Sequence, residues 1–204
     1  MLLTKPASSV VVLDFETTGL SPNQGDRAIE IGAVKLENGR IVDRFQRLMN
    51  PGKKVSRFIE NYTGISNEML VDAADCGSVM HDFADFIANS NLVAHNASFD
   101  QRFLDAEFAR IERGYEGTFA CSMLIARRLL QQAPSHKLGE LVHFCNIDND
   151  GTFHRALADA EMTTSLWLRL LEEVQQYGIQ NADFALMRKI SKTPKAAVHS
   201  LLCP

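Results

Sequence analysis

Three strand-like runs follow one another in the first fifty residues, and they limit the folds open to this chain. Residues 9–17, 27–36 and 40–49 are each rich in branched aliphatic or aromatic side chains. Asn38 and Gly39 separate the second run from the third. An Asn-Gly pair between two such runs is the strongest short signal for a hairpin. We therefore predict a three-stranded antiparallel meander at the start of the chain.

Beyond the meander, short apolar runs alternate with segments of helical periodicity. The periodicity predicts helices over 66–90, 97–114, 123–132, 137–147 and 155–178, and short strands over 91–96 and 117–122. The first of these helices is expected to break near Gly77. Antiparallel strands followed by alternating strands and helices are typical of an α/β fold, in which a mixed sheet is flanked by helices. We expect residues 1–177 to form this domain and residues 178–204, where periodicity is lost, to trail from it as an extension of unknown role.

Composition narrows the class of protein. A chain of 204 residues with 46% hydrophobic and 23% charged residues is expected to form one globular domain. It has no apolar stretch long enough to cross a bilayer and no signal peptide in its first nine residues. We therefore expect a cytoplasmic protein without a membrane partner. The four cysteines are widely spaced, with no Cys-x-x-Cys pair, and are expected to be reduced thiols.

Net charge bears on the choice of partner. A formal charge of −4 argues against a protein that grips long duplex DNA by neutralising many phosphates. Two segments, residues 50–57 and 187–195, are nevertheless basic. Such clusters usually lie on solvated surface without a binding role, and the alternative interpretation is a surface along which nucleic acid binds.

Asp14 and Glu16 stand at the end of the first strand-like run. Because successive side chains of a strand point to opposite faces, both carboxylates fall on the same face as Val10 and Val12. Two carboxylates held close together resist joint ionisation unless a cation or a proton lies between them. A strand that merely runs into a polar turn would contain the same residues, so a metal site here depends on partners further along the chain.

Further polar residues lie where the later helices are predicted to begin. Asp100 falls one turn into the helix after residues 91–96, with Asn96 at the cap position, and Asp159 falls near the start of the last helix. His154 is expected in the loop before that helix. Ordinary helix ends and loops also favour such residues. Four carboxylates in one cleft, however, would require positive charge, and such ligands suit Mg²⁺ or Mn²⁺. Two such ions can promote phosphoryl transfer, with His154 taking a proton from water.

Taken together, these residues resemble the DEDD exonuclease superfamily in its histidine-bearing (DEDDh) branch. The sequence is most similar to the exonuclease domain of the proofreading (epsilon) subunit of bacterial DNA polymerase III. The resemblance covers about residues 9–176 and rests on "DFETTG", "EIGAV", "TGIS", "AHNASFD", "ARRL", "HKLGEL" and "HRALADAE", in the order and spacing of the family. It implies a ribonuclease-H-like fold and metal-dependent removal of nucleotides from a 3′ end.

The resemblance also implies roles for individual residues. The matching metal-binding acids are Asp14, Glu16, Asp100 and Asp159, and His154 matches the general base. Asp14 would bridge two ions, Glu16 and Asp159 would complete the primary site, and Asp100 would hold the looser one. The positions that match nucleotide contacts are Thr17, Thr18, Gly19, Leu20, Thr63, Asn96 and Phe99.

Two family positions need separate interpretation. Thr63 stands where the proofreading subunit typically has a histidine in its "HGI" stretch. Glu30 matches an acid of the family, but we interpret a glutamate inside a strand as one with a structural partner rather than as a metal ligand.

We therefore expect a 3′-to-5′ exonuclease that hydrolyses single-stranded or frayed DNA ends to nucleoside 5′-monophosphates with two divalent ions. One alternative is an exoribonuclease that trims short RNA or RNA tails, because nothing in the sequence reads out a 2′-OH. Another is a non-catalytic, polymerase-associated module that binds nucleic acid, although the complete acid set counts against it. A replication or repair polymerase is a candidate partner, while the short segment after the last predicted helix favours a free-standing nuclease.

Overall fold

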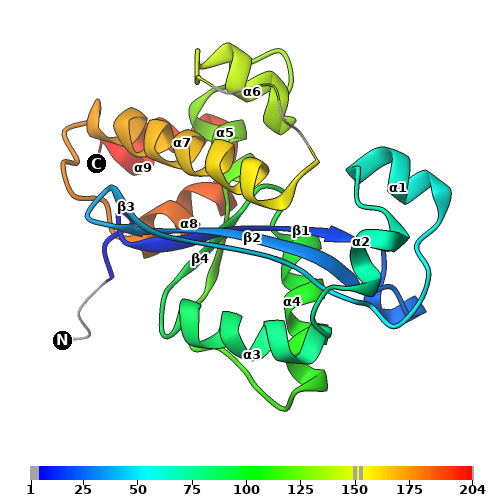
Figure 1. Ribbon diagram of the computed structural model, residues 1–204. Helices are drawn as coiled ribbons and strands as arrows, with labels where there is room; N and C mark the ends of the chain where they lie inside the picture. The colour runs from blue at the N-terminus through cyan, green and yellow to red at the C-terminus, as the bar shows by residue number, and fades with distance from the viewer. Residues whose placement is uncertain (1–4, 149–150, 152–153, 204) are drawn as a thin grey trace.

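The fold is built on one mixed sheet, seen in a computed structural model that describes residues 5–148, 151 and 154–203 (Figure 1). The strands lie in the order β3-β2-β1-β4-β5. Strands β1, β2 and β3 are antiparallel, and β4 and β5 run parallel to β1. The bounds are β1 (Val10–Thr17), β2 (Ala28–Glu37), β3 (Arg40–Leu48), β4 (Leu92–Ala94) and β5 (Phe119–Cys121). The α/β fold with a mixed sheet that the sequence predicts is confirmed.

The predicted Asn-Gly pair makes the hairpin between β2 and β3. Asn38 and Gly39 have φ angles of 51° and 77°, the left-handed conformations that a two-residue turn of this kind requires. The amide of Gly39 also donates to the carbonyl of Ser8 over 2.8 Å, which ties the turn to the segment before β1.

Helices cover both faces of the sheet. They are η1 (Pro22–Gln24), α1 (Arg57–Thr63), α2 (Asn67–Val71), α3 (Cys76–Ile87), α4 (Ser98–Arg110), α5 (Ser122–Leu129), α6 (Leu138–Phe144), α7 (Ala156–Gln175), α8 (Phe184–Lys192), η2 (Lys195–Ala197) and α9 (Val198–Leu202). The break expected near Gly77 lies earlier, at residues 72–75, because Asp75 caps α3 by accepting from the amide of Ser78. Within the described residues, no helix combines the length and the apolar character that a membrane span requires.

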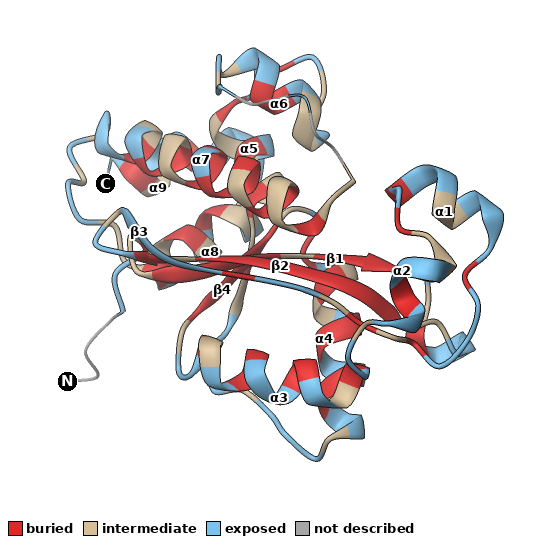
Figure 2. Cartoon of the chain, viewed as in Figure 1, coloured by how far each residue is buried: buried red, intermediate tan, exposed pale blue. Residues whose placement is uncertain are grey.

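The sheet separates two hydrophobic cores. Val10 and Val12 pack in the core formed with α5, α7 and α8, whereas Val11, Leu13 and Phe15 pack against α3 and α4. Figure 2 shows these buried strands between helices whose outer surfaces are exposed. The alternation along β1 agrees with the sequence prediction, and it directs the two acids at the end of β1 toward α7.

The segment expected to trail from the domain, residues 178–204, instead packs against it as far as the structure describes it, through residue 203. Phe184 of α8 is buried in the same core as Trp167 of α7, and their ring centroids lie 6.1 Å apart. Met187 and Ile190 are also buried. The amide of Phe184 donates to the carbonyl of Lys5 over 3.0 Å. The expectation is therefore wrong: α8 completes one core of the domain.

Close packing at Gly32 sets the position of α7 on the sheet. A Cβ atom added at Gly32 would lie 2.1 Å from the amide nitrogen of Leu157 and 2.2 Å from the carbonyl carbon of Ala156. Only glycine therefore lets the first turn of α7 lie directly on β2. In the register of β1 and β2, Gly32 pairs with Asp14, so this contact lies beside the acids of β1.

We predict that Gly32→Ala lowers the free energy of unfolding by about 3 kcal/mol, because the added methyl group meets backbone rather than a movable side chain. Urea denaturation monitored by circular dichroism measures the change. Gly114→Ala is the matched control, since a Cβ there meets nothing within 4 Å. Equal effects of the two substitutions would contradict the close approach of α7 to β2.

Candidate active site

One cleft, of about 640 Å³, is lined by residues from the end of β1, from α1 and α4, and from α7 and the loop before it. Every residue predicted for the site contributes to its lining: Asp14, Glu16, Thr17, Thr18, Gly19, Leu20, Thr63, Asn96, Phe99, Asp100, His154 and Asp159. The fold therefore gathers the predicted set in one place.

The carboxylates of the cleft crowd one another. Glu16, Asp100 and Asp159 are buried, with 8%, 2% and 8% of their surface exposed. Burial, reinforced by the charge of Asp159, raises the pKa of Glu16 to about 8. Burial likewise raises the pKa of Asp100 to about 8. The pKa of Asp14 is raised well above its usual value by burial and then by repulsion from Asp100 and Asp159. The cleft cannot ionise all four acids without a nearby cation.

Three residues of the cleft have the chemistry and the spacing to hold a divalent metal ion. Glu16, His154 and Asp159 each offer one ligand atom, and the three atoms lie within 4.8 Å of one another. Hard carboxylate oxygens are the ligands that Mg²⁺ and Mn²⁺ prefer, and a bound cation would offset both the burial and the mutual repulsion of the ionised acids.

His154 lies in the loop before α7, as predicted. Its backbone has a φ of 60°, and its amide donates to Oδ2 of Asp159 over 3.1 Å. Its ring contacts the ring of Tyr62 in α1, with centroids 4.0 Å apart. The imidazole is thus held beside the acids by contacts from two different elements.

Glu30 lies beneath the start of α7 and has the structural partner that the sequence interpretation expects. The guanidinium of Arg155 donates to both of its carboxylate oxygens, over 2.9 and 3.1 Å. The amide of Ala156 and the side chain of Gln46 also donate to Glu30, which is fully buried. This network fixes Arg155, the neighbour of His154, to β2.

A second buried ion pair holds α4. Arg27, just before β2, donates from Nε and Nη2 to the two oxygens of Glu107 over 2.8 and 2.9 Å. Glu107 is 1% exposed and also accepts from the amide of Ala28. The pair positions the helix that carries Asp100, whose Oδ1 accepts from the amide of Phe15 over 3.2 Å.

Asn96 does not act as the helix cap that the sequence predicts. The N-cap of α4 is Ala97, whose side chain makes no capping hydrogen bond. Asn96 has a φ of 66°, and its carbonyl accepts from the amide of Phe99 over 2.9 Å. Asparagine tolerates this left-handed conformation better than most residues do, and Asn96 lines the cleft instead.

Asp26, which sequence reasoning missed, organises the loop after β1. Its carboxylate accepts from the hydroxyl of Thr18 over 3.0 Å and from the amide of Ser21 over 3.1 Å. Thr17 donates its hydroxyl to the carbonyl of Gly19 over 2.7 Å. A Cβ at Gly19 would lie 2.4 Å from Oδ2 of Asp26, so the glycine makes room for this carboxylate.

Thr63, which replaces the histidine of the proofreading subunit, has a local structural contact. Its hydroxyl donates to the carbonyl of Ile59 over 2.9 Å and accepts from the amide of Ile65 over 3.1 Å. These bonds lie at the end of α1, and the side chain is buried.

Two exposed aromatic rings on α1 also line the cleft and were missed in the sequence. Phe58 and Tyr62 are 72% and 51% exposed, and their stacked rings have centroids 5.9 Å apart. Leu20, at the same cleft, is 78% exposed. The spacing of four residues between the two rings was the available signal, but α1 is too short for its periodicity to be recognised.

His95, which was also missed in the sequence, lies at the boundary between the cleft and α5. Its Nε2 lies 2.9 Å from the carbonyl oxygen of His136, and its Nδ1 lies 2.9 Å from the hydroxyl of Ser122. Burial lowers the pKa of His95 to about 4. The neutral ring therefore connects the cleft to the segment after α5.

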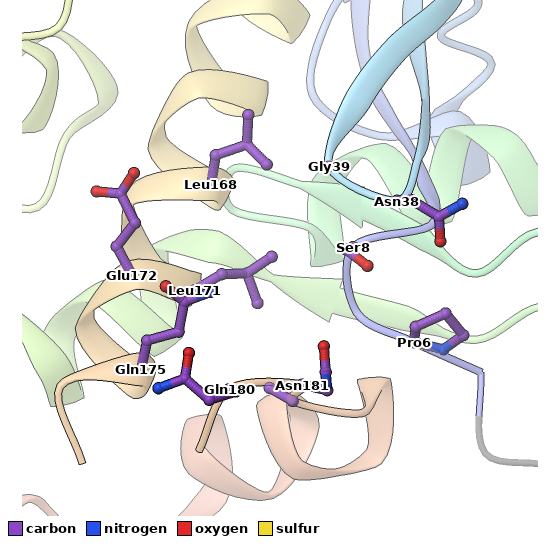
Figure 3. A pocket seen from close by; sticks show the side chains of 11 residues that line it. Pro6, Ser8, Asn38, Gly39, Leu168, Leu171, Glu172, Gln175, Gln180 and Asn181 are labelled. Atoms are coloured by element: carbon purple, nitrogen blue, oxygen red, sulfur yellow. The ribbon is translucent and has the colours of Figure 1, made fainter. Parts of the chain in front are cut away.

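Another cavity, of about 450 Å³, lies between α7, the turn joining β2 to β3, and the segment before α8 (Figure 3). Glu172 is the one titratable residue among those that line it. This cavity lacks the group of acids that line the cleft at the end of β1. The cleft at the end of β1 is therefore the candidate active site.

A mixed sheet whose first strand and two flanking helices deliver acids to one cleft defines the class of ribonuclease-H-like exonucleases. A family model described as Exonuclease matches residues 11–167, and the chain belongs to this family of nucleases. The resemblance to DEDD exonucleases that the sequence motifs indicate is thereby confirmed.

Sequence relatives are named DNA polymerase III PolC-type. The protein from Thermotoga petrophila is 41% identical over 179 residues, and that from Caldanaerobacter subterraneus subsp. tengcongensis is 39% identical over 173 residues. The matched regions cover 84% and 85% of this chain but only 12% of each relative.

Solved structures share the fold. Exonuclease X in complex with 5′ overhanging duplex DNA superposes with a TM-score of 0.68 and 25% identity, covering 89% of this chain and 99% of that one. Zinc-bound E. coli ExoI in complex with ssDNA gives a TM-score of 0.70 at 15% identity, covering 83% of this chain and 43% of that one, and supports the fold alone.

We predict that the metal-free protein loses stability as pH rises. Glu16 and Asp100 release their protons near pH 8 in the folded state but near pH 4, roughly, when unfolded. Between these values the folded state binds more protons, so the free energy of unfolding falls as pH increases. Urea denaturation in EDTA should show a loss on the order of a few kcal/mol from pH 5 to pH 9.

The substitution Glu16→Gln should reduce this loss, and Mg²⁺ should restore stability at high pH. Glu116→Gln, at an exposed position, is the matched control and should leave the pH dependence unchanged. A stability that is flat or rising with pH in EDTA would contradict the crowding of the acids.

Proposed function

We propose that this protein is a 3′-to-5′ exonuclease that hydrolyses single-stranded or frayed DNA ends to nucleoside 5′-monophosphates with two divalent ions. The observation that carries the proposal is the set of four acids in one cleft, two of which have a pKa of about 8. Such a concentration of buried negative charge costs stability unless cations, and then a phosphate, occupy the cleft.

The acids have separate roles in this proposal. Asp14 would help to hold both ions, Glu16 and Asp159 would complete the primary site, and Asp100 would hold the second ion. When bound, the ions would neutralise the carboxylates, lower the pKa of a water molecule and stabilise the departing oxygen. The ligand atoms that Glu16 and Asp159 present close together support this assignment.

His154 acts as the general base. Its amide hydrogen bond to Asp159 and its ring contact with Tyr62 hold the imidazole at the cleft. It accepts a proton from water as the water oxygen forms a bond to phosphorus. The bond from phosphorus to the 3′ oxygen of the preceding nucleotide breaks, that oxygen is protonated, and a nucleoside 5′-monophosphate leaves.

The lining of the cleft supports a nucleotide as its occupant. In this proposal the terminal nucleotide contacts seven residues of the cleft: Thr17, Thr18, Gly19, Leu20, Thr63, Asn96 and Phe99. The exposed rings of Phe58 and Tyr62 stack on bases, since base stacking on aromatic side chains tolerates any sequence.

DNA is the proposed substrate because the most identical relatives quoted above are PolC-type DNA polymerases and because exonuclease X was solved with duplex DNA. These relatives also support a polymerase as a candidate partner.

We predict that Asp14→Ala and Asp159→Ala abolish hydrolysis of a labelled oligonucleotide in Mg²⁺ while the protein stays folded. His154→Asn, which suits the left-handed backbone at that position, should lower the rate by roughly 10²- to 10⁴-fold. Rates from gel assays between pH 6 and pH 9 measure both effects. The exposed residues Asp82 and His81 of α3 supply matched controls as alanine variants. Full activity of either aspartate variant would refute the assignment.

A second experiment tests the substrate class. Matched DNA and RNA oligonucleotides, labelled at the 5′ end, are digested in Mg²⁺, in Mn²⁺ and in EDTA. We expect a ladder shortened from the 3′ end, faster loss of DNA than of RNA, and no cleavage in EDTA. Faster loss of RNA would replace DNA by RNA as the substrate. Cleavage in EDTA would exclude the metal-dependent reaction.

A further inference from the structure

The segments 122–139 and 184–203 concentrate positive charge in a chain whose net charge is −4. Neither contains an aspartate or a glutamate, and together they contain Arg127, Arg128, Lys137, Arg188, Lys189, Lys192 and Lys195. In the described part of the chain, none of these side chains forms an ion pair. By contrast, Arg27, Arg44, Arg155 and Arg169 are each paired with an acid.

Contacts between α5 and the end of α8 bring part of this charge together. The Nε of Arg128 donates to the carbonyl of Thr193 over 2.7 Å, and the side-chain amide of Gln131 lies 3.4 Å from the carbonyl of Lys195. The side chains of Arg127, Lys192 and Lys195 are exposed. Exposed cations without an acidic partner attract phosphates.

Hydrogen bonds of His95 connect the cleft to the start of α5 and to the segment before α6. The ring of His95, which lines the cleft, contacts Ser122 at the start of α5 and the carbonyl of His136. The ring of His136 in turn lies 3.2 Å from the carbonyl of Leu130, at the end of α5. Arg127 follows Ser122 by five residues, which is about 7.5 Å along a helix axis. Lys137 directly follows His136 in the chain.

We propose that Arg127, Arg128, Lys137, Lys192 and Lys195 form a basic track that binds the sugar-phosphate backbone of the substrate strand upstream of its 3′ end. This inference rests on the proposed function. The acids of the cleft repel the strand that they help to cut, and the track supplies attraction at nucleotides that lie outside the cleft. The C-terminal segment thereby contributes to substrate binding through Lys192 and Lys195.

The test compares a long substrate with a short one. The triple variant Arg127→Gln, Lys192→Gln, Lys195→Gln omits Arg128, because the side chain of Arg128 has a structural contact. On a DNA strand of 30 nucleotides at 0.1 M salt, the KM of this variant should rise roughly tenfold. The slope of log KM against log salt should fall by about 2, as expected when three phosphate contacts to a single strand are lost. On a trinucleotide, too short to reach the track, KM and kcat should not change.

Matched neutralisation elsewhere is the control. The triple variant Arg40→Gln, Arg47→Gln, Arg113→Gln removes the same charge from exposed positions outside the track and should behave like the wild type on both substrates. A wild-type salt slope on the long strand for the track variant would overturn the track, as would equal losses on the trinucleotide. Wild-type protein that cleaves neither substrate would instead refute the proposed function.

Discussion

Two ion pairs, one at β2 and one at the residue just before β2, hold the helices that complete the cleft. Glu30 of β2 binds the guanidinium of Arg155 at the start of α7, and Arg27, next to β2, binds Glu107 of α4. One pair lies on each face of the sheet. Because the geometry is bidentate, each pair fixes orientation as well as distance. Loss of either arginine would leave a buried glutamate charge uncompensated, at a cost of about 3 to 5 kcal/mol.

This rigid support explains how the cleft can hold acids that repel one another. If α4 and α7 were free to shift, the carboxylates would move apart and be solvated. The ion pairs and the contact of α7 with Gly32 prevent that relaxation. The acids therefore stay buried and close together, and burial, followed by repulsion from neighbouring acids, raises the pKa values of Glu16 and Asp100. The support of α4 and α7 and the crowding of the acids are therefore two results of the same packing, and a bound cation would relieve the crowding.

The sequence predicts the parts of this arrangement that depend on local rules. Strand alternation places Asp14 and Glu16, the Asn-Gly pair places the hairpin, and helix periodicity places α7. Contacts between distant segments were not predictable in this way. Nothing in the sequence near Arg27 indicates that its partner is Glu107. The stacked rings belong to α1, which is too short for a helical period to be recognised. The packing of α8 was not predicted because its lysines interrupt the apolar pattern formed by three buried residues, Phe184, Met187 and Ile190.

The close approach at Gly32 has a consequence for judging which related chains are competent enzymes. A chain could keep all four acids and the histidine, gain one methyl group at this position, and still have α7 displaced from β2. Its motif would be intact on inspection while its geometry was not. The glycine and the glutamate two residues before it therefore belong among the diagnostic positions for activity, although neither lines the cleft.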